Sequence, residues 1–95
     1  MDLELDREWL RRTAGWRNWE RGVAYAEDGR VGPLTVVPGG FRATVEGSRA
    51  YEACLVATAG GPTWHGDCPM GEAGDLCKHI VALGVAILDR SADPA

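Results

Sequence analysis

The chain carries a long apolar segment near its end, "HIVALGVAIL" at residues 79–88, which is hydrophobic on nearly every side when drawn as a helix. Its uninterrupted apolar run, from Ile80 to Leu88, is nine residues long, about half of what a bilayer span requires. We therefore expect no membrane partner, and a helix that something else must cover. The face expected to pack on the domain's own core carries Ile80, Leu83, Gly84 and Ile87. The adjoining face carries Val81, Val85 and Leu88.

Two interpretations of the adjoining face are open. A helix that is apolar all round is usually buried, in which case segments near the start of the chain would cover it. Alternatively, Val81, Val85 and Leu88 form an exposed docking surface for a protein partner or for a second copy of the chain.

Residues 6–28 are expected to form two helices. The first, "DREWLRRTAG", has Asp6 as its N-cap and stops at Gly15. The second, "NWERGVAYAEDG", has Asn18 as its cap and Gly29 at its end. We expect the two tryptophans here, Trp16 and Trp19, to be core anchors rather than stacking platforms, because bulky aromatic side chains dominate small cores.

The middle of the chain changes to a period of two, which is typical of strands. The segments "RVGPLTVV", "GFRATVEG" and "AYEACLVATA" are separated by the turn signals "PGG" and "GSR". They predict a three-stranded antiparallel β-meander over about 30–58, with "GGPTW" as a connection after it. In the third segment, Tyr51, Ala53 and Leu55 share one face and Cys54 lies on the other. The fold class is therefore α+β, in a single domain that spans 1–95.

Soft metal-binding side chains are concentrated in one stretch, "WHGDCPMGEAGDLCKHIVAL" at 64–83. Cys68 precedes a proline-containing turn, and Cys77 and His79 follow at the entry of the C-terminal helix, for which Asp75 is a suitable N-cap. Thiolate sulfur and imidazole nitrogen are the usual donors of a tetrahedral zinc site. We therefore expect a zinc loop over 64–79, leading into a C-terminal helix over 76–90. Three cysteines, an odd number, argue against a disulfide framework, and together with the absence of a secretory signal they favour the reducing cytoplasm.

This stretch resembles the SWIM-type zinc finger, whose pattern is cysteine-x-cysteine, a spacer, and then cysteine-x-histidine. "CPMGEAGDLCKHIVALGVAIL" matches the second half of that pattern, and the similarity extends upstream to cover about residues 19–88. The resemblance implies a small sheet with a zinc site between it and the C-terminal helix. It also implies a binding module that contacts DNA or other proteins. One position departs from the pattern: Gly66 stands where the family has its first cysteine.

Glycine offers no donor, so a fourth ligand must come from elsewhere or be absent. His65, three residues before Cys68, is the expected substitute, because structural zinc sites favour four protein donors. Cys54 is the rival, although a buried free cysteine more often acts as a small core residue. Asp67 ranks below both, because neighbouring side chains in an extended segment diverge.

Charge and motifs separate the classes of function. The net charge of −4 disfavours autonomous DNA binding, although arginines at positions 7, 11, 12, 17 and 21 leave a local basic patch. We expect a structural zinc module that supports protein–protein contact, and no enzyme, because no catalytic motif such as HExxH or CxxC is present. The alternative is a metal-free degenerate finger that acts through its C-terminal helix in interaction or dimerisation.

Overall fold

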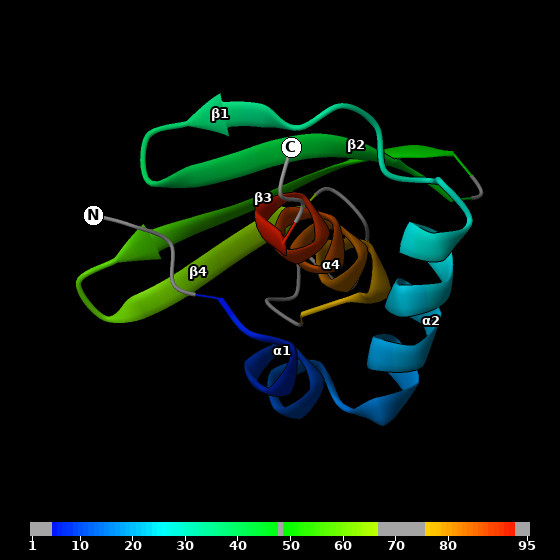
Figure 1. Cartoon of the computed structure of the whole chain (residues 1–95), viewed down its shortest axis with the longest axis horizontal. Helices are drawn as coiled ribbons and strands as arrows, with labels where there is room; N and C mark the ends of the chain where they lie inside the picture. Colours follow the sequence, from blue (N-terminus) through cyan, green and yellow to red (C-terminus); the bar gives the residue numbers. More distant parts are fainter. Residues whose placement is uncertain (1–4, 48, 67–75, 93–95) are drawn as a thin grey trace.

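The computed structural model describes residues 5–47, 49–66 and 76–92. In these residues the elements are, in chain order, α1 (Arg7–Ala14), α2 (Trp16–Glu27), β1 (Thr35–Val37), β2 (Gly40–Glu46), β3 (Ala50–Thr58), β4 (Gly61–Gly66) and α4 (Lys78–Ala92). The four strands form one antiparallel sheet in the order β1-β2-β3-β4. Helix α4 lies against the sheet, and α1 and α2 pack on α4 from its other sides (Figure 1). The α+β class predicted from the sequence is confirmed.

Helix α1 begins and ends at the predicted residues, whereas α2 ends as predicted, just before Gly29 with its φ of 73°, but begins earlier than predicted. Asp6 caps α1, accepting a hydrogen bond of 2.7 Å from the Trp9 amide, and α1 ends at Gly15. Gly15 has a φ of 84°, a conformation that favours glycine, and α2 begins directly after it. The expectation that Asn18 caps α2 is therefore wrong. Asn18 lies inside the helix, and its side-chain amide reaches back to the Ala14 carbonyl at 3.4 Å.

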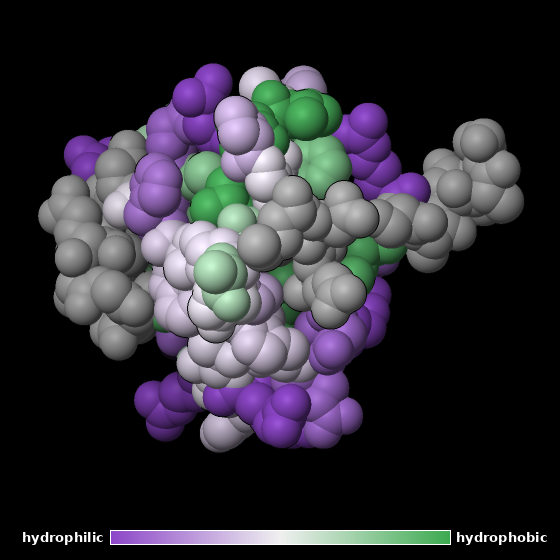
Figure 2. Space-filling view, turned by 90° about the vertical axis from the view of Figure 1, so that its left-hand side faces the viewer, coloured by the Kyte–Doolittle hydropathy of each residue, from purple (hydrophilic) through white to green (hydrophobic). Residues whose placement is uncertain are grey.

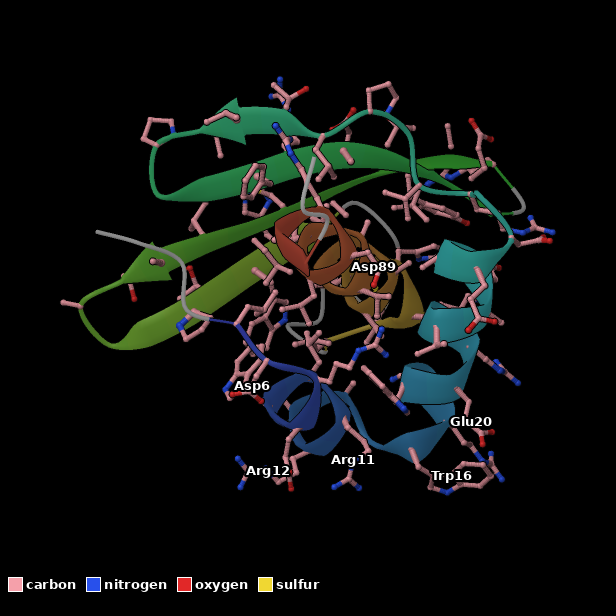
Figure 3. All side chains as sticks on the ribbon, viewed as in Figure 1. Asp6, Arg11, Arg12, Trp16, Glu20 and Asp89 are labelled. Carbon is pink, nitrogen blue, oxygen red and sulfur yellow. The ribbon has the colours of Figure 1, made fainter. Side chains whose placement is uncertain are left out.

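The two tryptophans of α2 have different environments. Trp19 packs against the buried core, as expected. Trp16 stands at the first position of the helix and remains 64% exposed. The expectation that Trp16 is a core anchor is wrong, because the turn at Gly15 starts α2 with this side chain directed away from α4 and the sheet (Figure 3).

The sheet has one strand more than the three predicted. Residues 61–66, expected to form a connection, are β4, which pairs with β3 through a two-residue turn at Ala59 and Gly60. Pro62 concealed this strand in the sequence, but a proline is tolerated on an edge strand because its missing N–H is not needed there. At the other edge, the predicted strand from 30 to 37 contains Pro33 and shortens to β1, with an isolated bridge between Val31 and Val45.

The two faces of the sheet differ in what covers them. The inner face packs against α4 and carries the buried core residues Ala43, Val45, Ala53 and Leu55. Tyr51 is in phase with Ala53 and Leu55, as the sequence predicted, and also packs against this core. Cys54 has the opposite phase, and its partners across the strands are Arg42 on β2 and His65 on β4. These three residues therefore lie on the outer face.

Helix α4 is covered on the face that was expected to be available for docking. Val81 is fully buried and Val85 is 2% exposed, while Leu88 is partly buried and packs against the core. Helix α2 approaches α4 at Gly22, where an added Cβ would collide with the Val81 side chain. The expected interaction surface of Val81, Val85 and Leu88 is thus corrected: the first two side chains are part of the domain's own core. In the described residues, no helix combines the length and the apolar character needed to cross a membrane.

Gly22→Ala is expected to destabilise the domain by about 1–3 kcal/mol, because the new methyl group overpacks the contact with Val81 and approaches the Lys78 carbonyl oxygen at 2.9 Å. This loss outweighs the gain of up to about 1 kcal/mol that alanine brings to a helix. Urea unfolding measures the change. Gly60→Ala, in the exposed β3–β4 turn, is the matched control and should change stability little, because the added Cβ would make only an ordinary contact of 3.9 Å with Thr58 Oγ1. Equal stability of the two variants would contradict the close packing of α2 on α4.

Candidate metal site at the start of α4

Cys77 and His79 meet at the first turn of α4, as the sequence predicted for two donors at the helix entry. Cys77 precedes the helix, and its carbonyl accepts the hydrogen bond from the Val81 amide. Both side chains are buried, with exposed fractions of 1% for Cys77 and 6% for His79. The Cys77 Sγ atom lies 3.8 Å from His79 Nδ1. The helix entry therefore brings one sulfur and one ring nitrogen together away from solvent.

This separation suits two ligands of one zinc ion. With Zn–S near 2.3 Å and Zn–N near 2.0–2.1 Å, a tetrahedral angle places the two donor atoms about 3.6 Å apart. The observed 3.8 Å between Cys77 Sγ and His79 Nδ1 is close to that value. The same distance also accommodates a hydrogen bond between a thiol and an imidazole. The pair thus fits half of a tetrahedral donor set, and it also fits a metal-free contact.

Aromatic side chains from two other elements hold the His79 ring in place. Tyr51 of β3 packs on it with ring centroids 4.3 Å apart and planes inclined by 31°. Tyr25 of α2 meets it edge-on at 5.6 Å. The turn after β2 closes the third side, since a Cβ at Gly47 would lie 2.9 Å from His79 Nε2. A ring enclosed in this way cannot turn freely, which preorganises its nitrogen atoms for a ligand.

Three cations surround these tyrosine rings. Arg30 and Lys78 lie over the Tyr25 ring at 5.1 and 5.5 Å, and Arg49 lies over the Tyr51 ring at 5.1 Å. Sequence reasoning missed this arrangement, because the three cations come from the segment after α2, the β2–β3 turn and α4 and share no motif.

The two candidates for a fourth ligand lie elsewhere. His65 is exposed on the outer face of the sheet, directly opposite Cys54 on the neighbouring strand. Trp64 and Gly66, on either side of His65, face α4, so the alternation of the strand directs His65 away from Cys77 and His79. The structure therefore does not bring His65 or Cys54 together with the helix-entry pair. Within residues 5–47, 49–66 and 76–92, no cluster of three or more histidine, cysteine or acidic side chains could hold a metal ion.

The position that departs from the SWIM pattern lies on the side of the sheet that faces α4. A Cβ added at Gly66 would lie 3.4 Å from Ile80 Cδ1 in the first turn of that helix, and 3.1 Å from the Glu52 carbonyl oxygen. A side chain at residue 66 would thus share the inner face with the start of α4. Cys68, Asp67 and Asp75 fall outside the described residues.

Comparisons with known proteins leave the resemblance as a hypothesis. No family model matches the chain, and neither a curated protein nor a solved structure does.

Cys54 is a buried thiol on the outer face of the sheet, with an exposed fraction of 8%. Burial raises its pKa, the nearby Arg42 opposes the rise, and Glu52 adds to it. Because the folded protein favours the neutral thiol, this group contributes stability that is fully present below the pKa of the unfolded thiol. That stability is lost as the pH rises through the raised value.

We expect Cys54 to react with iodoacetamide several-fold more slowly in the folded protein than in urea at pH 8, because the thiolate is the reactive form. Mass spectrometry of the Cys54 peptide gives both rates. The folded-state rate should continue to increase with pH above the range in which an exposed thiol levels off. Equal rates in the two states would show that the fold does not protect the Cys54 thiol.

Proposed function

We propose that this domain is a zinc-binding module in which Cys77 and His79 hold the ion together with Cys68, and that the metal is structural. The observation that carries the proposal is the 3.8 Å separation of Cys77 Sγ and His79 Nδ1 at a buried helix entry. The resemblance to the SWIM-type finger supports the inclusion of Cys68. Because His65 and Cys54 lie on the outer face, we do not assign the fourth position to either of them.

A structural role fits the construction of the site. The donor pair joins the start of α4 to α2 and β3 through the Tyr25 and Tyr51 rings. A metal held there would tie the helix entry to the part of the chain that carries Cys68, and metal binding of this kind supplies folding energy. A reducing compartment such as the cytoplasm would keep the thiols available for the ion.

The module's role is proposed to be contact with another protein. The net charge of −4 opposes binding to a polyanion, so DNA is the less favoured partner. In this proposal the zinc ion performs no chemistry, and it fixes the scaffold that presents the interaction surface.

Metal analysis tests the ligand assignment. Protein purified without added zinc should contain one zinc ion per chain by inductively coupled plasma mass spectrometry. Cys77→Ser and His79→Ala should lose most of the metal, because each removes one donor of the proposed site. Cys54→Ala and His65→Ala are the matched controls: each removes the same type of donor from the outer face, and each should keep the zinc.

Treatment with a chelator distinguishes the proposed zinc module from the alternative, a metal-free degenerate finger. Excess chelator should abolish the cooperative thermal transition of the wild-type domain. A metal-free wild type that melts cooperatively, unaffected by chelator, would contradict the proposal. In that case the contact between Cys77 and His79 would be a hydrogen bond within a degenerate finger.

A further inference from the structure

An exposed tryptophan marks the junction of α1 and α2. Among the described residues the exposed large hydrophobic side chains are Trp16, at 64%, and Val36, at 69%. Trp16 is not among the residues that pack against the core, whereas Trp19, one turn later, is. An exposed indole combines a large apolar surface with an N–H donor, which is why tryptophan is enriched at protein interfaces.

Arginines are concentrated in the sequence on both sides of Trp16. Residues 7–21 contain five arginines and two glutamates, which gives this segment a charge of +3 in a chain whose net charge is −4. Arg12, Arg17 and Arg21 are exposed, and they form no ion pair or side-chain hydrogen bond among the described residues. The segment contains no lysine. Arginine and tryptophan are the residue types that are enriched at the energetic centre of a protein interface.

The surface is held on a rigid support. Arg11, Arg12 and Trp16 point away from the sheet at the same end of the molecule, with Glu20 beside Trp16 (Figure 3). Hydrophilic side chains gather at this end, at the level of α1, in the space-filling view (Figure 2). Leu10, fully buried, anchors α1 against α4 at Gly84. We call this surface the elbow, and it consists of Arg11, Arg12, Trp16, Arg17 and Arg21.

We propose that the elbow is a docking surface for an acidic segment of a partner protein, with an apolar side chain of that segment covering Trp16. Arg17 and Arg21 are one turn apart on α2 and present two cations on one face. The glutamates at 8 and 20 interrupt the positive surface and would repel a continuous run of phosphates. A protein segment can place its carboxylates beside the arginines and leave the glutamates in solvent.

This inference rests on the proposed function only for its interaction role, and it requires no contact with the metal site. The elbow is built from α1 and the first half of α2, whereas Cys77 and His79 lie at the start of α4. Binding at the elbow can therefore be absent while the protein still holds zinc. Zinc content measured on the same samples shows whether the docking proposal alone has failed or the zinc proposal has failed as well.

The experiment is a titration of ¹⁵N-labelled full-length protein with three probes: a short peptide in which Asp and Glu alternate with Leu, its counterpart with Lys in place of the acids, and single-stranded oligothymidylate. The acidic peptide should shift the Trp16 indole signal and the amides of residues 7–21, and added salt should weaken its binding. Trp16→Ser should weaken binding about tenfold or more. Val36→Ser, which alters the other exposed hydrophobic side chain, should leave binding unchanged.

Three results would overturn the proposal. The first is the absence of any shift with the acidic peptide at low salt. The second is an equal response to the lysine peptide. The third is tighter binding of the oligonucleotide than of the acidic peptide, which would assign the elbow to nucleic acid.

Discussion

The burial of α4 is the constraint on which the rest of the structure depends. This helix is apolar on nearly every side, so the sheet, α1 and α2 must together remove it from water. Each of these neighbours approaches it at a glycine: Gly22 of α2 meets Val81, Gly66 of β4 meets Ile80, and Gly84 of α4 itself meets Leu10 of α1. Small residues at these points allow close approach, which makes a large buried surface possible in a chain of 95 residues.

The candidate metal site depends on the same packing. Because α4 is fixed between α2 and the sheet, its first turn presents His79 to Tyr25 and Tyr51, with Cys77 beside it. The proposed site and the proposed interaction surface are thereby separated: the donors lie inside at the start of α4, and the exposed indole of Trp16 lies outside where α1 meets α2. In this account the interior supplies stability, and the arginine-rich exterior supplies recognition.

Local signals predicted much of this arrangement, and tertiary context decided the rest. The α+β class, the Asp6 cap and the meeting of Cys77 with His79 follow from composition, capping chemistry and spacing. The strand β4 could not be predicted in this way. Its residues Gly61 and Pro62 are untypical of strands, and its pairing with β3 is permitted because β4 lies at the edge of the sheet. The placement of His65 depends on that missed strand, since its alternation turns the imidazole to the outer face. The burial of Val81 and Val85 depends on how closely α2 can approach, which a periodicity analysis of one helix does not contain.

Cobalt substitution tests the central claim most directly, because tetrahedral Co²⁺ reports both its geometry and its thiolate ligands in the absorption spectrum. The account predicts intense visible bands of a tetrahedral site and a near-ultraviolet band from thiolate-to-cobalt charge transfer. The charge-transfer band should decrease in Cys77→Ser and remain unchanged in Cys54→Ala. A spectrum of weakly absorbing, octahedral cobalt in the wild-type protein would show that the pair at the start of α4 does not form a metal site.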